Sequence, residues 1–151
     1  MAHANVPLQT TVLVVDDSLE LQRYLRTLLE LDSYHVLTAS NGFEALHLLH
    51  LGCTPAVALV DLQMPGIDGL ETLRRLRKLR PALKVIMCSG VEDPDKIHEV
   101  MALGAHAYLI KPIQHLYLSA AIERCLQEHS VQRPAERPAA RVFVMSSPNL
   151  P

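Results

Sequence analysis

The stretch TVLVVDD, residues 11–17, leads a short apolar segment directly into two adjacent carboxylates, Asp16 and Asp17. Three later apolar segments also end in a polar or charged side chain: Ala56–Val60 in Asp61, Val85–Cys88 in Ser89, and Ala107–Ile110 in Lys111. If these segments are neighbouring parallel strands, their ends lie along the edge of the sheet where ligands of open α/β folds bind. The sequence therefore predicts a shallow pocket that holds three carboxylates, a hydroxyl and an ammonium group.

Helical patterns separate the apolar segments, and this alternation is typical of βαβ units with a parallel sheet. The segments are continuously apolar, which suits strands that helices cover on both faces. Start signals precede the expected helices: Ser18, the pair Asn41 and Glu44, the pair Asp68 and Glu71, Asp93-Pro94, and Lys111-Pro112 before a last helix to about Glu128. With a further strand at about Tyr34–Ala39, the predicted fold class is α/β, a doubly wound sheet of five parallel strands with five helices.

The composition indicates one domain with a substantial core, because 49% of the 151 residues are hydrophobic. We place this domain at residues 10–129, after an N-terminal extension at 1–9. The segment 130–151 is rich in Pro, Ala and Arg, and we expect a tail that is weakly structured on its own. The net charge of −2 gives no bulk reason to expect direct nucleic-acid binding.

The cysteines favour a reducing compartment. Cys53, Cys88 and Cys125 are odd in number and have no paired CxxC spacing, which argues against a disulfide framework and against a zinc site. The first residues lack the basic region and apolar stretch of a signal peptide, and no apolar run is long enough for membrane insertion. We therefore expect a cytoplasmic protein.

The charges of the predicted pocket require a cation. Two unit charges about 4 Å apart interact by about 4 kcal/mol at an effective dielectric constant of about 20, so three carboxylates repel one another strongly. Lys111 supplies one positive charge, and a divalent ion would supply the rest. Since the candidate ligands Asp16, Asp17 and Asp61 are all oxygen donors, Mg²⁺ or Mn²⁺ is favoured over zinc.

The ordered set Asp16-Asp17, Asp61, Ser89 and Lys111-Pro112 resembles the receiver domain of two-component response regulators, over about residues 10–128. Other residues agree with this family: Met64-Pro65, Gly69, Gly104-Ala105 and Tyr108. The stand-alone, chemotaxis-regulator-like type is the most similar. The resemblance implies a flavodoxin-like sheet with strand order 2-1-3-4-5, and a cis peptide bond between Lys111 and Pro112.

The resemblance also implies a role for each residue of the pocket. Asp61 would be the phosphoacceptor, with a histidine kinase or a histidine phosphotransfer protein as the partner. Asp17 and Asp61 would bind the metal directly, Asp16 largely through water, and Gln63 through its backbone carbonyl. Ser89 and Lys111 would hold oxygens of the phosphoryl group.

A switch is implied as well: the Ser89 position moves inward, and Tyr108 rotates into the space that it leaves. This change would remodel the face made by the fourth helix, the fifth strand and the fifth helix. We expect His98, His106 and His115, which could lie near that face, to be surface polar residues. The charged pairs typical of receivers that dimerise through this face are not evident, which favours a monomer.

Several functions stay open at this point. The leading hypothesis is a stand-alone signalling protein that acts on a downstream protein. The alternatives are a phosphorelay intermediate, which passes the group to another histidine protein, and the receiver portion of a larger regulator, with the Pro-rich tail as a linker. A haloacid-dehalogenase-like phosphatase would carry its nucleophile after the first strand, and a degenerate receiver would lack Asp61 or Lys111. We expect no enzyme activity beyond self-phosphorylation from a phosphodonor and slow autodephosphorylation.

Overall fold

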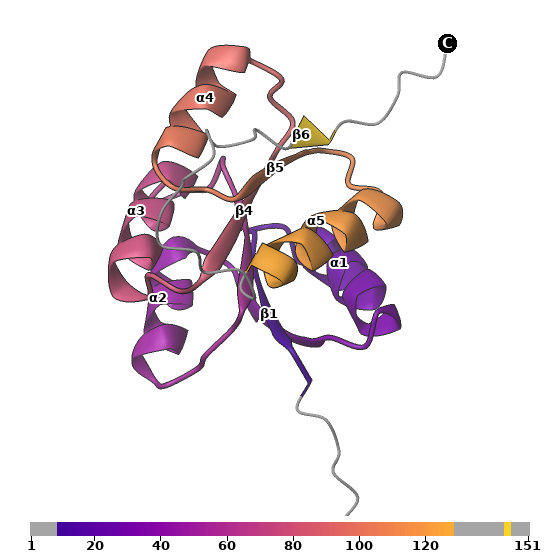
Figure 1. Ribbon diagram of the computed structural model, residues 1–151. Helices are drawn as coiled ribbons and strands as arrows, with labels where there is room; N and C mark the ends of the chain where they lie inside the picture. Colours follow the sequence, from indigo (N-terminus) through magenta and orange to yellow (C-terminus); the bar gives the residue numbers. More distant parts are fainter. Residues whose placement is uncertain (1–8, 129–143, 146–151) are drawn as a thin grey trace, which may run out of the picture.

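The computed structural model describes residues 9–128 and 144–145, and its strands form a single parallel sheet (Figure 1). Its elements are, in chain order, β1 (Thr11–Val15), α1 (Leu19–Leu31), β2 (His35–Ala39), α2 (Gly42–His50), β3 (Val57–Asp61), α3 (Gly69–Leu79), β4 (Lys84–Ser89), α4 (Pro94–Ala102), β5 (Ala107–Ile110), α5 (His115–Gln127) and β6 (Val144–Met145). The strand order is β2-β1-β3-β4-β5-β6. The predicted five-stranded core with order 2-1-3-4-5 is confirmed.

The short strand β6 was not predicted. It lies in the segment 130–151, the expected tail, and pairs in parallel with the outer edge of β5. The rest of that segment and residues 1–8 of the expected N-terminal extension lie outside the described residues. A two-residue strand has no periodic pattern of its own, so only the neighbouring strand reveals it.

The central strands are mostly apolar because both faces of the sheet are covered. Helices α2, α3 and α4 lie on one face, and α1 and α5 lie on the other (Figure 1). Alternate residues of β1 divide between the two cores: Leu13 and Val15 pack on the first side, Val12 and Val14 on the second. This arrangement makes each strand end a fixed point from which a functional side chain projects. In the described part of the chain, no helix is long and apolar enough to cross a membrane.

The predicted helix starts are confirmed as N-caps, but the capping boxes are incomplete. Side chains of the cap residues accept hydrogen bonds from backbone N–H groups: Ser18 from Leu21, Asn41 from Glu44, Asp68 from Glu71, and Asp93 from Asp95. In a full box the acid would return to the N–H of the cap residue. Instead the Glu44 carboxylate accepts from the N–H of Ser40, and Glu71 pairs with Arg74 and Arg75.

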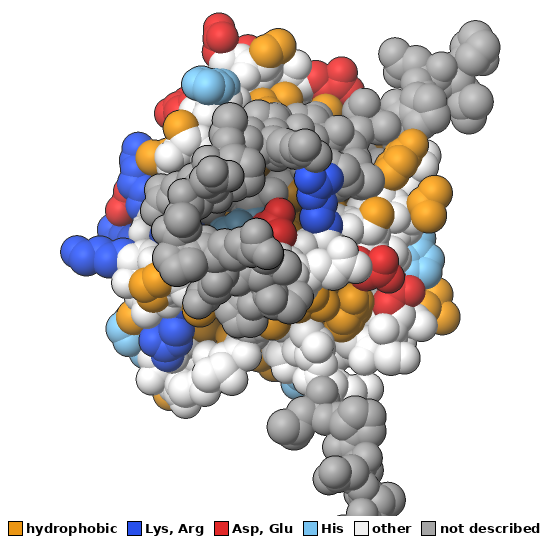
Figure 2. Space-filling model, in the orientation of Figure 1, with side chains coloured by type: hydrophobic (Ala, Val, Ile, Leu, Met, Phe, Trp, Pro, Cys, Tyr) orange, Lys and Arg blue, Asp and Glu red, His pale blue; other side chains and the backbone are white. Residues whose placement is uncertain are grey.

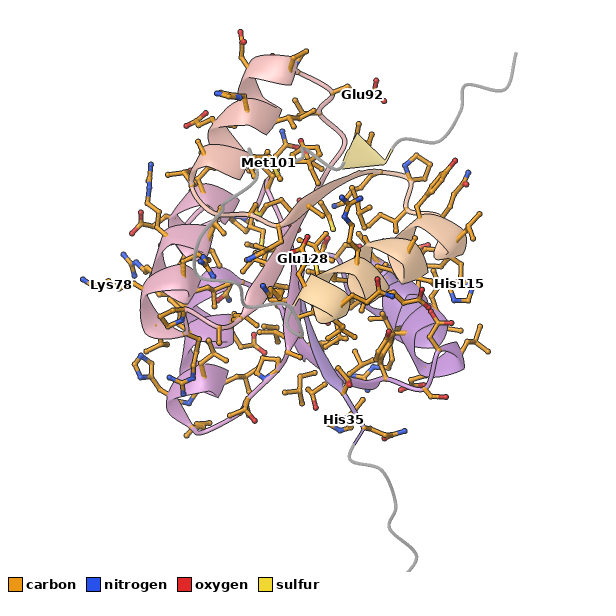
Figure 3. The ribbon with its side chains drawn as sticks, in the orientation of Figure 1. His35, Lys78, Glu92, Met101, His115 and Glu128 are labelled. Carbon is orange, nitrogen blue, oxygen red and sulfur yellow. The ribbon has the colours of Figure 1, made fainter. Side chains whose placement is uncertain are left out.

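Basic side chains give α3 a solvated outer face. Figure 2 shows Lys and Arg side chains gathered over this helix, and Lys78 points away from the molecule (Figure 3). Part of this charge is balanced within the helix, because Glu71 lies 2.9 Å from Arg75 and 3.4 Å from Arg74. Such exposed pairs contribute little to stability.

Gly69 lets the first turn of α3 lie directly against the end of β3. A Cβ atom at this position would lie 2.5 Å from both the carbonyl oxygen of Asp61 and the Cα of Leu62. The Gly69 N–H donates to the Leu62 carbonyl at 3.1 Å, which closes this turn. The backbone that carries Asp61 is therefore held by a contact that only glycine permits.

We expect Gly69→Ala to lower the free energy of unfolding by about 1–3 kcal/mol, because the new methyl group meets backbone atoms that cannot move away. Urea denaturation measures this loss. The matched control is Gly90→Ala, where no described atom lies within 4 Å of the added Cβ. Equal stability of the two variants would show that the close approach is not a constraint.

The prediction of surface polar residues is wrong for His106, whereas His115 is a partly exposed polar residue. His106 is a partly buried structural residue: its Nδ1 accepts a hydrogen bond from the Val85 N–H at 3.0 Å. His115 pairs with Asp32 at the end of α1, at 3.0 Å, on the side of α5 that faces α1 (Figure 3). Neither contact is visible in the sequence, because each joins segments that are distant along the chain.

Burial, together with Lys84 and Arg77, lowers the pKa of His106 to about 4 from its ordinary 6.5. Between these two values the unfolded chain binds a proton that the folded chain does not bind. The free energy of unfolding should therefore fall as the pH is lowered through this window. His106→Asn keeps an acceptor for the Val85 N–H but cannot titrate, so its stability should depend less on pH. Denaturation between pH 7 and 4 tests this, with the exposed His98→Asn as the control that keeps the wild-type slope.

Candidate functional site

The ends of four neighbouring strands bring the predicted residues together. Lys111, one residue after β5, extends its Nζ to 3.1 Å from Asp16 Oδ2 and 3.4 Å from Asp61 Oδ1. Asp16 follows β1, and Asp61 is the last residue of β3. The sequence separation between Lys111 and Asp16 shows that the contact is made by the sheet order and not by local structure.

Asp16 is held on all sides. One carboxylate oxygen accepts from the Ser18 N–H at 2.9 Å, and the other accepts from Lys111. Its backbone carbonyl accepts from the side-chain amide of Gln22 at 2.6 Å. Sequence analysis missed Gln22, although it lies on the buried stripe of α1, one turn before Leu25. A polar residue within an apolar stripe was the signal that could have identified it.

Asp61 keeps one oxygen free of the described residues. Its Oδ1 accepts from the Gln63 N–H at 3.1 Å and lies near Lys111, whereas Oδ2 has no hydrogen-bond donor in the described part of the chain. Burial raises the pKa of Asp61, and Asp16 adds to the effect, while the Gln63 N–H and Lys111 oppose it. The contacts with the Gln63 N–H and Lys111 therefore do not fully offset the cost of burying the negative charge of Asp61.

The pKa of Lys111 is raised, which favours the charged form of its side chain. Burial would lower this pKa, but hydrogen bonds and charge interactions with Asp16 and Asp61 outweigh burial and raise it. The ammonium form is thus the stable one beside these carboxylates. One cation still leaves an excess of negative charge when all three acids are ionised.

Asp16, Asp17 and Asp61 can offer one carboxylate oxygen each within 4.8 Å of one another. Asp17 is exposed, and within the described residues its carboxylate has no partner. All donors are oxygens, the set that hard divalent cations such as Mg²⁺ prefer. The residues present therefore fit a divalent cation, and the cluster matches the predicted metal site.

Ser89 and Tyr108 contact the same residue. The Ser89 hydroxyl accepts from the Val91 N–H at 3.0 Å, and the Tyr108 hydroxyl donates to the Val91 carbonyl at 2.8 Å. Both side chains are buried. The Tyr108 ring is buried in this structure, and its rotation into the space left by Ser89 stays a prediction. The role of Val91 as the link between them was not predicted.

The loop that carries Lys111 is anchored at both ends. The Lys111–Pro112 peptide bond is cis, as predicted. The Lys111 N–H donates to the Ser89 carbonyl at 2.8 Å, and the Tyr24 hydroxyl donates to the Ile113 carbonyl at 2.8 Å. Tyr24 is a further positioning residue that sequence analysis missed, because its partner lies 89 residues away.

A cavity of about 530 Å³ opens beside the carboxylate cluster and not over it. Gln63, Val91 and Lys96 are among its lining residues, from the loops after β3 and β4 and from α4. Asp16, Asp17 and Asp61 are not among its lining residues; Asp17 is exposed, whereas Asp16 and Asp61 are buried.

The family model described as the response regulator receiver domain matches residues 12–123. The chain belongs to the receiver domain family of two-component response regulators. The matched segment lies inside residues 10–129, where sequence analysis placed the domain; the exact limits remain predictions. Receiver domains are signalling domains, and this membership disfavours the phosphatase hypothesis.

Curated relatives of this receiver domain are transcriptional regulators. The CpxR homolog of Haemophilus influenzae is 38% identical over 116 residues, which is 77% of this chain and 50% of the relative. The positive alginate biosynthesis regulatory protein of Pseudomonas aeruginosa is 36% identical over 124 residues, 80% of this chain and 49% of that protein. The chain thus spans about half the length of these relatives.

Solved receiver domains share the fold over almost their full length. The receiver domain protein of Clostridium thermocellum is 34% identical, with a TM-score of 0.75, and the match covers 80% of this chain and 96% of that one. A CheY-like receiver domain protein of Methanospirillum hungatei is 30% identical with the same TM-score, covering 80% and 95%. These neighbours confirm the family and the fold.

We predict that Asp17→Ala weakens Mg²⁺ binding by about 10–100-fold or more, because its free carboxylate is the most available ligand. Asp16→Ala should weaken binding less, since both Asp16 oxygens already have protein partners. Titration calorimetry with Mg²⁺ measures both losses. Glu20→Ala, which removes an acid from the first turn of α1, is the control and should bind like wild type. Equal losses at positions 16 and 17 would overturn this assignment of ligands.

Proposed function

We propose that this chain is a phosphorylation-dependent signalling protein that accepts a phosphoryl group on Asp61 from a histidine kinase in the presence of Mg²⁺. The observation that carries the proposal is the position of Asp61. This carboxylate lies beside the Lys111 ammonium, 3.4 Å away, in a cluster of three acids, with one oxygen free of the described residues. Such an arrangement suits a nucleophile whose negative charge is balanced by nearby positive charge when the phosphoryl group arrives.

The transfer forms one bond and breaks one. The free Asp61 oxygen attacks the phosphorus of a phosphohistidine, an O–P bond forms, and the P–N bond to the imidazole breaks, leaving that ring with the electron pair. In this proposal Lys111 Nζ and the Ser89 hydroxyl hold oxygens of the transferred group. In phosphoryl transfer the protein mainly positions groups and balances charge.

The acidic cluster would hold the metal. Asp17 and Asp61 are the proposed direct ligands, together with the Gln63 backbone carbonyl, and Asp16 would act largely through water. A bound Mg²⁺ supplies positive charge against the phosphoryl oxygens. The Gln63 N–H already donates to Asp61 at 3.1 Å, which keeps residue 63 close to the carboxylate.

The signal would leave the site through Ser89, Val91 and Tyr108. A phosphoryl group brings about −1.5 to −2 charges and strong acceptor oxygens, which attract the Ser89 hydroxyl. To move a two-state equilibrium from about 1:99 to about 99:1 takes about 5.5 kcal/mol. Hydrogen bonds to a charged group contribute about 1.5–3 kcal/mol each, so about two to four new ones suffice. The proposed readout surface is the face made by α4, β5 and α5.

Two further functions keep the same chemistry. The lengths of the curated relatives favour the alternative that this receiver is a portion of a larger regulator of transcription. A phosphorelay role, with a histidine phosphotransfer protein as the second partner, differs only in where the phosphoryl group goes next. In each case the phosphodonor is a cytoplasmic histidine protein, and the described residues are proposed to contact proteins and not nucleic acid.

We expect Asp61→Asn to abolish labelling by acetyl phosphate with Mg²⁺, because the amide is not a nucleophile. Intact-protein mass spectrometry detects the phosphoryl adduct. The matched control is Asp68→Asn, which retains a good N-cap residue for α3 and should label like wild type. Without metal, Asp61→Asn should melt at the same temperature as wild type or higher, since it removes a carboxylate whose pKa burial raises. Retained labelling of Asp61→Asn would mean that another residue is the acceptor.

A further inference from the structure

The outer edge of the sheet is occupied by the chain itself. Strand β6 pairs in parallel with β5, with Val144 opposite Tyr108 and Met145 opposite Leu109 (Figure 1). Without β6, β5 would be the last strand on this side. The edge of a sheet presents unpaired N–H and C=O groups, to which another extended segment can add. This edge therefore accepts an added parallel strand.

The added strand is short, and this sets how firmly it is held. Only two residues pair, whereas each of β1 and β3 pairs on both sides over several residues. Elements with few paired backbone groups open at much lower free energy than core strands. Strand β6 is consequently the most easily displaced strand of the described sheet.

A continuous set of contacts connects β6 with the acidic site. At the site, the Ser89 hydroxyl accepts from the Val91 N–H at 3.0 Å. The Val91 carbonyl then accepts from the Tyr108 hydroxyl at 2.8 Å, and the backbone of Tyr108 pairs with Val144. A change at Ser89 reaches the paired edge of β5 through one intervening residue.

We propose that the edge of β5 is a strand-addition surface, that the Val144–Met145 segment of this chain occupies it in the unphosphorylated protein, and that phosphorylation releases this segment. The release rests on the proposed function, whereas the occupancy does not. Phosphorylation draws Ser89 toward Asp61, which disturbs Val91, the Tyr108 hydroxyl and then the pairing of β5 with β6.

The occupancy is tested on the full chain, without phosphodonor, by amide hydrogen exchange. The variant Val144→Pro/Met145→Pro removes both backbone N–H groups of β6. The control Val144→Thr/Met145→Thr keeps them and keeps residues that favour strands. We expect the Ala107–Ile110 amides that do not face β4 to exchange about five-fold faster or more in the proline variant, with the threonine variant like wild type. Amides of β1 and β3 report intact folding. Equal exchange of β5 in all three proteins would overturn the proposal.

The release is tested with beryllofluoride and Mg²⁺, a non-covalent mimic of the phosphoryl group. In wild type the same β5 amides should lose protection on binding. Because coupling is reciprocal, the proline variant should bind beryllofluoride about five-fold more tightly or better, and the threonine variant should bind like wild type. Wild-type affinity in the proline variant, or unchanged β5 exchange in beryllofluoride-bound wild type, would overturn the release. Failure of wild type to bind beryllofluoride or to label at Asp61 would count against the proposed function, and the occupancy would still be decided by the first experiment.

Discussion

The ammonium group of Lys111 lies between two nearly buried carboxylates, and the geometry of the acidic edge depends on this contact. It reaches Asp16 at 3.1 Å and Asp61 at 3.4 Å, from a strand that is not adjacent to either of theirs. Removing one partner of a buried ion pair leaves an uncompensated charge, which typically costs about 3–5 kcal/mol. Yet one ammonium does not balance three acids. Burial is the main reason that the pKa of Asp61 is raised, with Asp16 adding to it, and a divalent cation at the acidic cluster would oppose this shift.

The strands and loops around Asp16, Asp61 and Lys111 hold these side chains in fixed positions. Strands β1, β3, β4 and β5 are buried on both faces, so close packing holds their ends in position. Polar contacts then fix the segments that follow them: Gln22 holds the carbonyl of Asp16, and Tyr24 holds the loop after Lys111. Gly69 lets α3 approach the end of β3. The Asp61 carboxylate and the Lys111 ammonium are thereby held in place by packing and by these hydrogen bonds.

The residues that we propose to respond to phosphorylation lie on the β4 and β5 side of Asp61. Val91 is only half-buried, and it joins the buried hydroxyls of Ser89 and Tyr108 through its N–H and its carbonyl. From Tyr108 the connection continues to the outer edge of the sheet, where β6 is paired over two residues. In the proposed release, a change of charge at Asp61 is transmitted toward β6 and not toward β1.

The sequence by itself determined the five core strands, the helix starts and the identity of the charged site. Continuous apolar runs require burial on both faces, and parallel strands between helices place their carboxyl ends at one edge, so Asp16, Asp61, Ser89 and Lys111 could be grouped before any coordinates. Only the tertiary structure decided the roles of Gln22, Tyr24, His106 and β6. Each of these depends on a partner that is distant in the chain or on an edge that exists only after the sheet has formed, and no local pattern encodes such a contact. The hydrophobic pattern of a segment indicates which of its sides is buried. Which atoms the buried side chains contact depends on how the segments pack together.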